Sequence, residues 1–254
     1  MNMRVMLALL KREILEHRNI WFTPVILIVV AILVRLSLIF GNLNIDSELP
    51  PQLMLDDQLS SVVNDVLVYG LNWMNYIITM TLMAAACFYT LSCLFNERQD
   101  ESVLFWRSLP VSDTTTIVSK LLIALVVAPI SVLICQVVVA FIFFGFGAFD
   151  YLAMYFGSSL TLLIKMIFWS LLPTVAWCLF CSEVAKKNPF LLAFIAPILL
   201  WVIDSLFLRS VIGDNIMLNR WFGFDSYTRV PLICGLVLSA LFIIFATVKR
   251  SQRI

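Results

Sequence analysis

Three charged residues interrupt long apolar segments of the sequence: Arg35, Lys165 and Asp204. Because a charge is costly inside a bilayer, such residues pair with one another, extend toward the headgroups or line a transport pathway. Arg35 and Asp204 each lie about 15 residues, or roughly 22 Å, from the inner end of their segment, and Lys165 lies near the outer end of its own. All three are therefore expected in the outer half of the membrane, where Asp204 could pair with either cation. A structural ion pair or a headgroup contact is the favoured interpretation, and a place on a substrate path is the alternative.

The residue types that carry most enzyme chemistry are scarce or isolated. The single histidine, His17, precedes the first apolar segment, and HExxH and GxSxG motifs are absent from the sequence. Cys178 and Cys181 have CxxC spacing, but no second pair accompanies them, so we expect small buried side chains rather than a metal or redox site. Four further cysteines also fall in apolar stretches: Cys87, Cys93, Cys135 and Cys234. The sequence therefore predicts no catalytic site, no metal site, and a chain that is not itself an enzyme.

The elements that must position these residues are membrane-spanning helices. The chain of 254 residues is 62% hydrophobic and only 13% charged, which is far more apolar than a soluble domain. A span needs about 20 mostly apolar residues. Six segments pass this test and predict an all-α polytopic membrane protein with a single domain over residues 1–254: Ile20–Phe40, Tyr69–Leu94, Ile117–Phe146, Leu160–Cys181, Pro189–Leu206 and Val230–Thr247.

The distribution of basic residues predicts the orientation of these helices. With both ends of the chain in the cytoplasm, the inner segments hold twelve Lys and Arg residues and the outer segments hold three. Short cytoplasmic loops collect such residues. The first outer loop (41–68) carries five acidic residues and no Lys or Arg, which favours the same N-in, C-in topology. The net charge is only +1, so the chain lacks the excess of basic residues that attracts nucleic acid, and no nucleic-acid partner is expected.

Two segments outside the spans carry many apolar residues. Residues 1–19 repeat apolar side chains at helical spacing, which predicts a helix lying in the cytoplasmic interface or, alternatively, an extension of the first span. The apolar positions are Met3, Leu7, Leu10 and Ile14. Pro24 is expected to break the helix between this segment and the first span. The last outer loop (207–229) is rich in apolar and aromatic residues, and it either re-enters the outer leaflet or forms an interfacial aromatic belt.

The cytoplasmic loop over residues 96–116 combines charges with large apolar side chains. Its centre is the run Val103, Leu104, Phe105, Trp106 and Arg107. Aromatic residues and arginine are enriched in the cores of protein interfaces, so a contact with another protein accounts for this run. Anchoring of the aromatic rings in the inner headgroup layer is an equal alternative. After the loop, Ser112 or Asp113 is expected to cap the N-terminus of the third span.

The same loop carries a recognisable motif. It contains, in order, Glu97-Arg98, Ser102, Leu104, the run Leu109-Pro110-Val111-Ser112 and then Lys120-Leu121-Leu122. This pattern resembles the motif ER-x-x-GT-x-x-x-L-x-x-x-PVS, with a following K-L, in permease subunits of the ABC-2 type of ABC transporter. The usual Gly-Thr pair of that family is Glu101-Ser102 here, and Leu-Phe-Trp-Arg is bulkier than its usual leucine run. The docking geometry is therefore expected to differ from that of the family.

The resemblance implies that the loop is a coupling helix, which docks on a separate ATPase subunit and passes its movement to the spans. It makes the following residues the expected contact surface: Glu97, Arg98, Val103, Leu104, Phe105, Trp106 and Arg107. A smaller contact is implied for Glu183, Lys186 and Lys187 in the second inner loop. None of the eight glycines begins a GxxxxGK[ST] motif, so this chain is expected to bind no cofactor, with ATP and Mg held by the partner ATPase.

The resemblance also implies the membrane, the direction of transport and the partner subunits of the chain. It predicts an exporter in a bacterial inner membrane, in which this permease pairs with a second permease copy, a homodimer being expected, and with two ATPase subunits. An ion-coupled secondary transporter that uses Asp204 as a proton site is the alternative. A polytopic membrane enzyme is a weaker one, because the sequence lacks paired acids at catalytic spacing within a span.

Overall fold

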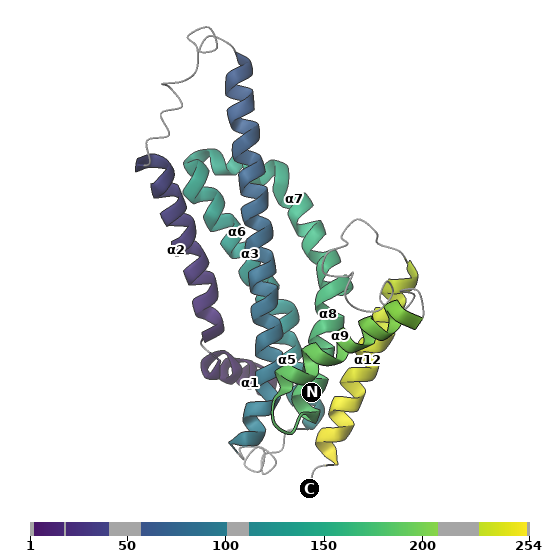
Figure 1. The fold of residues 1–254 in the computed structure, drawn as a ribbon. Coiled ribbons are helices and arrows are strands. Elements are labelled where there is room, and N and C mark those ends of the chain that lie inside the picture. The colour runs from purple at the N-terminus through teal and green to yellow at the C-terminus, as the bar shows by residue number, and fades with distance from the viewer. Residues whose placement is uncertain (1–2, 18, 41–56, 101–111, 208–228, 253–254) are drawn as a thin grey trace.

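The computed structural model describes residues 3–17, 19–40, 57–100, 112–207 and 229–252. Within these ranges every regular element is a helix (Figure 1). Five helical segments are long and apolar enough to cross a membrane: Asn72–Gln99, Asp113–Gly147, Ser159–Val184, Pro189–Leu206 and Pro231–Ser251. A further apolar helical segment, Phe22–Ser37, is shorter. The chain is therefore a helical protein with several segments that can span a membrane, as the sequence predicts.

Each apolar segment predicted from the sequence coincides with one helix or with a run of consecutive helices. The single helices are α2 (Asn19–Phe40), α3 (Asp57–Gln99), α9 (Pro189–Phe207) and α12 (Arg229–Ser251). The third segment is the run of α5 (Asp113–Leu122), η3 (Ile123–Val127) and α6 (Ala128–Phe144). After the short turn η4 (Gly145–Gly147), the fourth segment is the run of α7 (Ala148–Met166), η5 (Ile167–Leu171) and α8 (Leu172–Val184).

A separate helix precedes the first span. α1 (Met3–Glu16) lies across one end of the bundle, the end that also holds the last turn of α12, and we call this the α1 end (Figure 1). α1 stops at Glu16 and α2 begins at Asn19, so the expected break at Pro24 is wrong. Pro24 lies in the second turn of α2, where its missing N–H removes a single hydrogen bond at the start of a long helix.

Two span prolines follow π-helical segments. η3 ends just before the turn that contains Pro129, and η5 ends just before the turn that contains Pro173. In each segment, the closing N–H donates to the carbonyl five residues earlier. Because a proline ring crowds the carbonyl four residues before it, a wider turn at this place relieves the clash. Pro197, by contrast, lies inside the α-helix α9.

The helices pack into two main apolar clusters. α8 is central and packs mainly against α12 and α3. The cluster at the α1 end joins α3, α5, α8 and α12, and α1 packs against it through Leu10 and Ile14. The second cluster joins α2, α3, α6 and α7. The turn from α6 into α7 passes through Gly145, whose φ of 57° is readily adopted only by glycine.

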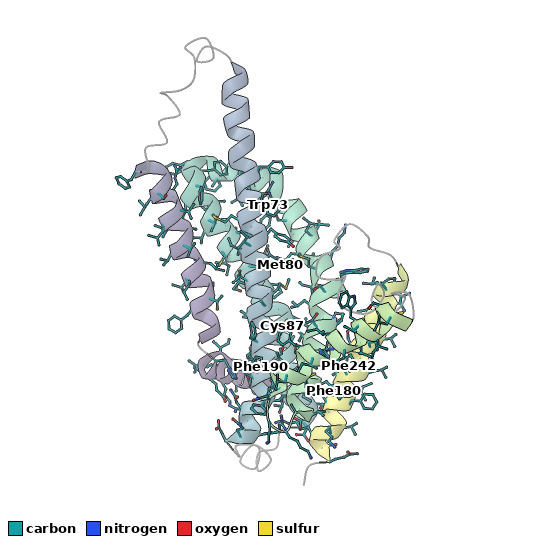
Figure 2. All side chains as sticks on the ribbon, in the orientation of Figure 1. Trp73, Met80, Cys87, Phe180, Phe190 and Phe242 are labelled. Carbon is teal, nitrogen blue, oxygen red and sulfur yellow. The ribbon has the colours of Figure 1, made fainter. Side chains whose placement is uncertain are left out.

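Large apolar side chains cover the outside of the bundle (Figure 2). Phe22 and Leu33 on α2, Leu199 on α9 and Ile244 on α12 are all exposed. Continuous apolar surface on this scale is unfavourable in water and is expected where helices face lipid. The surface, like the length of the helices, fits a multi-pass membrane protein.

Candidate functional site

Lys120 is the centre of a group of charged side chains at the α1 end. It lies on α5, is 0% exposed, and places Nζ 2.6 Å from Glu13 Oε1 and 3.0 Å from Glu97 Oε1. Glu13 on α1 and Glu97 on α3 are only 1% and 2% exposed. Charges removed from water in this way are stable only when they are paired. Lys120 therefore binds three helices together.

Arg250 extends this group to the last described helix. From α12, its Nη1 and Nη2 donate to Glu97 Oε2 at 3.1 and 3.2 Å, and its Nε donates to Asp113 Oδ1 at 3.1 Å. The planar guanidinium is suited to such simultaneous contacts. Arg12 adds a longer contact of 3.6 Å to Glu97 Oε1. We call Glu13, Glu97, Asp113, Lys120 and Arg250 the buried charge network.

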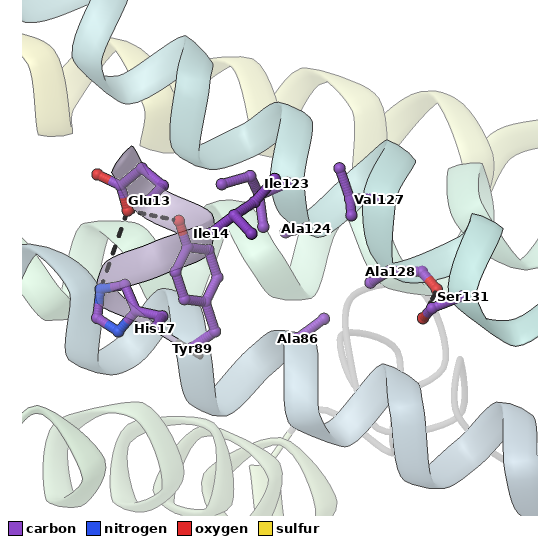
Figure 3. A pocket seen from close by; sticks show the side chains of 10 residues that line it. All are labelled: Glu13, Ile14, His17, Ala86, Tyr89, Ile123, Ala124, Val127, Ala128 and Ser131. Atoms are coloured by element: carbon purple, nitrogen blue, oxygen red, sulfur yellow. Dashed lines mark hydrogen bonds and ion pairs between the residues drawn. The ribbon is translucent and has the colours of Figure 1, made fainter. Parts of the chain in front are cut away.

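Tyr89 and His17 complete the surroundings of Glu13 (Figure 3). The Tyr89 hydroxyl donates to Glu13 Oε2 at 2.9 Å, and His17 Nε2 lies 3.9 Å from the same oxygen. The His17 ring meets the Tyr89 ring edge-on, with centroids 5.0 Å apart. Burial lowers the pKa of His17 from its ordinary value, and the neighbouring Glu13 carboxylate only partly opposes that effect. His17 is thus neutral beside Glu13 at pH 7.

A small pocket opens beside these three side chains. It offers about 20 Å³ to the centre of a water molecule, which is room for roughly one water. Its walls come from α1, α3, η3 and α6: Glu13, Ile14, His17, Ala86, Tyr89, Ile123, Ala124, Val127, Ala128 and Ser131. The pocket is therefore too small to hold a ligand much larger than a water molecule.

The end of α3 is also tied to the end of α8. Arg98 Nη2 donates to the carbonyl oxygens of Ser182 and Ala185, the latter at 2.8 Å. The Phe95 N–H donates to Ser182 Oγ at 3.0 Å. The short turn after α8 is therefore fixed to the last turn of α3.

The expected contact residues of the 96–116 loop fall into two groups. Residues 101–111, which include Val103, Leu104, Phe105, Trp106 and Arg107, lie outside the described residues. Glu97 and Arg98 are described, but Glu97 points into the buried charge network and Arg98 binds the α8 carbonyls. On the other side of the loop, Ser112 caps α5, where its Oγ accepts from the Thr115 N–H at 3.3 Å, as predicted.

The charged residues of the second inner loop differ in their exposure. Glu183 is 1% exposed, whereas Lys186 and Lys187 are both exposed at the turn between α8 and α9. The two lysines thus have the accessibility that a contact with a partner requires, and Glu183 does not. The predicted docking role of all ten contact residues stays a prediction.

The three charges expected in the outer half of the membrane lie on three different helices. Arg35 on α2 is half-buried, Lys165 on α7 is exposed, and Asp204 on α9 is 1% exposed. α9 packs mainly against α8 and α3, and α2 packs against α6 and α3. The pairing of Asp204 with either cation stays a prediction.

A group of uncharged polar side chains joins α3 to α6 and α7, far from the α1 end. Asn75 Nδ2 donates to the Tyr151 hydroxyl at 3.2 Å, and that hydroxyl donates to Asn72 Oδ1 at 3.3 Å. Gln136 Nε2 donates to Thr79 Oγ1 at 3.2 Å. Such hydrogen bonds between spans stabilise helix association in an apolar environment.

The pairing within this network was not predicted from the sequence. Glu97 and Lys120 were noted as parts of the loop motif, Asp113 as a possible helix cap and Arg250 as one of the inner basic residues, and Glu13 was given no role. A signal was nevertheless present, because Met6, Leu9 and Glu13 recur at helical spacing, so the carboxylate shares the apolar face of α1. An acid on an apolar helix face requires a buried cation.

Comparison with known protein families, curated proteins and solved structures gives no match. The chemistry of the site therefore rests on its geometry alone. Within the described ranges, no group of three His, Cys, Asp or Glu side chains could hold a metal, and the six cysteines are free and buried or half-buried. The buried charge network links α1, α3, α5 and α12 through ion pairs, so the geometry of the site supports a structural connection between four helices.

Proposed function

We propose that the chain is the membrane-spanning permease subunit of an ATP-driven transporter, of the ABC-2 type that its loop motif resembles. It has six spans with both ends in the cytoplasm of a bacterial cell, and it acts as an exporter in the inner membrane. A separate ATPase subunit, which holds ATP and Mg, docks on the loop 96–116. A second permease copy completes the pathway.

One observation carries this proposal: Arg250 forms ion pairs with a residue before the loop and with a residue after it. Glu97, four residues before residue 101, and Asp113, two residues after residue 111, both bind the Arg250 guanidinium. A partner that displaced the loop would therefore pull directly on α12, and through Lys120 on α1. This is the arrangement that coupling to a separate motor requires, because force must pass from the loop to the spans.

A second set of contacts supports the same conclusion. The two segments expected to meet the ATPase, the loop and the turn after α8, are joined at their bases by Arg98. The exposed Lys186 and Lys187 project from that turn. The two segments therefore form one platform, and its exposed lysines suit a groove with acidic side chains.

The test is to purify the tagged chain in mild detergent, identify copurifying proteins by mass spectrometry, and assay ATP hydrolysis. We expect a P-loop ATPase in about equal ratio. Replacement of Phe105 and Trp106 by Ala should abolish its recovery or its stimulation. Replacement of Phe146 and Phe149, two exposed aromatic residues near η4 at the opposite end of the bundle, should leave both unchanged. Recovery of the chain alone, without an ATPase, contradicts the proposal.

Asp204 supports one other candidate function. A carboxylate that is 1% exposed on a membrane helix is suited to carry a proton, as in an ion-coupled secondary transporter. Transport that survives ATP depletion but collapses with the ion gradient, and that is lost in Asp204→Asn, would favour this function over the ATP-driven one.

A further inference from the structure

α1 has two different faces, and only one of them belongs to the buried charge network. The inner face buries Met6, Leu9 and Glu13, and Glu13 binds Lys120. The outer face exposes Leu7 and Leu15, which are 60% and 66% exposed. The inner face already has its own apolar contacts, so these two leucines are additional apolar surface on the side of the helix that faces away from the protein. Two large apolar side chains exposed on one face indicate that something other than water covers that face.

Lys11 lies between the two exposed leucines. Positions 7, 11 and 15 are four residues apart and so form one stripe along the helix. Lys11 is exposed, and it makes no ion pair with any residue in the described ranges. Its neighbour Arg12, in contrast, binds Glu16 at 3.1 Å and contacts Glu97. The stripe therefore offers one unpaired ammonium flanked by apolar surface on both sides.

The stripe continues into surface that faces the membrane. α2 begins three residues after α1 ends, and its first described turns expose Phe22, Val25 and Ile26. α1 crosses the bundle at the level where this span starts (Figure 1). A cation at that level, with leucines one turn away on each side, has the pattern of a side chain that extends to a lipid phosphate.

We propose that Leu7, Lys11 and Leu15 form a binding site for an anionic phospholipid of the leaflet at the α1 end. The leucines contact the acyl chains near the headgroup, and the Lys11 ammonium binds the phosphate. Lipid binding on this face does not depend on the identity of the transporter. Because Glu13 lies on the opposite face of the same helix, the bound lipid holds α1 against the buried charge network.

The test uses the full chain in a neutral detergent and follows the thermal unfolding midpoint as phosphatidylglycerol is added. Wild-type protein should be stabilised at lower concentrations of phosphatidylglycerol than of phosphatidylcholine. A lysine near an anionic surface contributes about 1 kcal/mol, so Lys11→Gln should raise the half-maximal concentration of phosphatidylglycerol about fivefold. Lys11→Arg, which keeps the charge, should bind as the wild type does.

Lys249→Gln is the matched control, because Lys249 is also exposed and makes no ion pair in the described ranges. It should leave the half-maximal concentration unchanged. Inorganic phosphate should give no stabilisation, which separates a lipid site from a simple anion site. The proposal is overturned if Lys11→Gln binds phosphatidylglycerol as the wild type does, or if Lys249→Gln raises the half-maximal concentration as much as Lys11→Gln does. It is also overturned if inorganic phosphate alone stabilises the protein. None of these measurements involves an ATPase, so the lipid site can be tested separately from the proposed transport function.

Discussion

Lys120 keeps its charge in a place that water does not reach. Its ammonium lies within 3.0 Å of two carboxylates, and those carboxylates have further partners in Tyr89 and Arg250. A buried ion pair gives little net stability compared with apolar packing, but the loss of one partner leaves the other charge stranded. The network is therefore a place where single substitutions are costly and paired ones are tolerated.

The first prediction concerns Lys120→Met, which leaves Glu13 and Glu97 facing each other without their common cation. We expect a loss of about 3–5 kcal/mol in the free energy of unfolding, measured by denaturant titration in detergent. Lys120→Met combined with Glu13→Gln should recover part of that loss, because one stranded charge is gone. Lys187→Met, at an exposed site, should change stability by no more than about 0.5 kcal/mol. An unperturbed Lys120→Met protein would contradict the ion pairing.

The second prediction concerns pH. The pKa of His17 lies below its ordinary value of 6.5 because burial disfavours the charged ring, so the unfolded chain takes up this proton more readily than the folded one. Stability from this group is therefore complete above about pH 6.5 and declines as the pH falls toward the lowered pKa.

The measurement is the thermal unfolding midpoint of wild-type and His17→Gln protein between pH 5 and pH 8. The substitution should reduce the fall of the unfolding midpoint with decreasing pH on the acid side, and it should leave the midpoint at pH 8 little changed. A slope that is identical in both proteins would show that His17 is not the source of the acid sensitivity.

At the scale of elements, the ends of α3 and α5 share one anchor. Arg250 from α12 binds Glu97 in the last turn of α3 and Asp113 in the first turn of α5. Lys120 on α5 also binds Glu97 at 3.0 Å, but Arg250 is the side chain that contacts the last turn of α3 and the first turn of α5 from a third helix. The helix ends should loosen together when it is removed.

Hydrogen exchange tests that expectation. In Arg250→Gln, the amides of residues 94–99 and 113–117 should exchange at least about tenfold faster, because charged hydrogen bonds of about 1.5–3 kcal/mol are lost. Lys249→Gln changes the neighbouring exposed residue by the same chemistry and should leave both segments protected. Acceleration confined to one of the two segments would show that Arg250 does not bridge them.

The elements themselves could be predicted with fair accuracy, and the site could not. Apolar length is a local property, so all six predicted segments coincide with helices, and of the two expected caps, Ser112 and Asp113, Ser112 is the one that caps α5. The break before α2 was misplaced at Pro24, because a proline near the start of a helix costs little. The pairing of Lys120 with Glu13 joins residues 107 positions apart, and periodicity along the chain carries no information about such a partner.

At the scale of the whole molecule, the first and last described helices and the buried charge network meet at one end. α1, the last turn of α12 and the buried charge network all lie at the α1 end (Figure 1). The positive-inside rule predicts that this end lies in the cytoplasm. The orientation follows from sequence alone and needs its own measurement.

A pair of reporter fusions supplies it. Alkaline phosphatase, which folds only outside the cytoplasm, should be inactive when fused after Arg253 and active when inserted within residues 208–228. Green fluorescent protein fused after Arg253 should fluoresce. Active phosphatase after Arg253 would invert the orientation and, with it, the proposed place of the ATPase.

The buried charge network also has a consequence for the order in which the chain is made. Glu13 is synthesised 107 residues before Lys120, and Glu97 is synthesised 153 residues before Arg250. Until α12 enters the membrane, Asp113 and one oxygen of Glu97 have no guanidinium to bind. A nascent chain that stalls before α12 therefore has three carboxylates of the network facing the single cation Lys120, and insertion of α12 adds the second cation, Arg250. Completion of synthesis thus becomes a condition for stability.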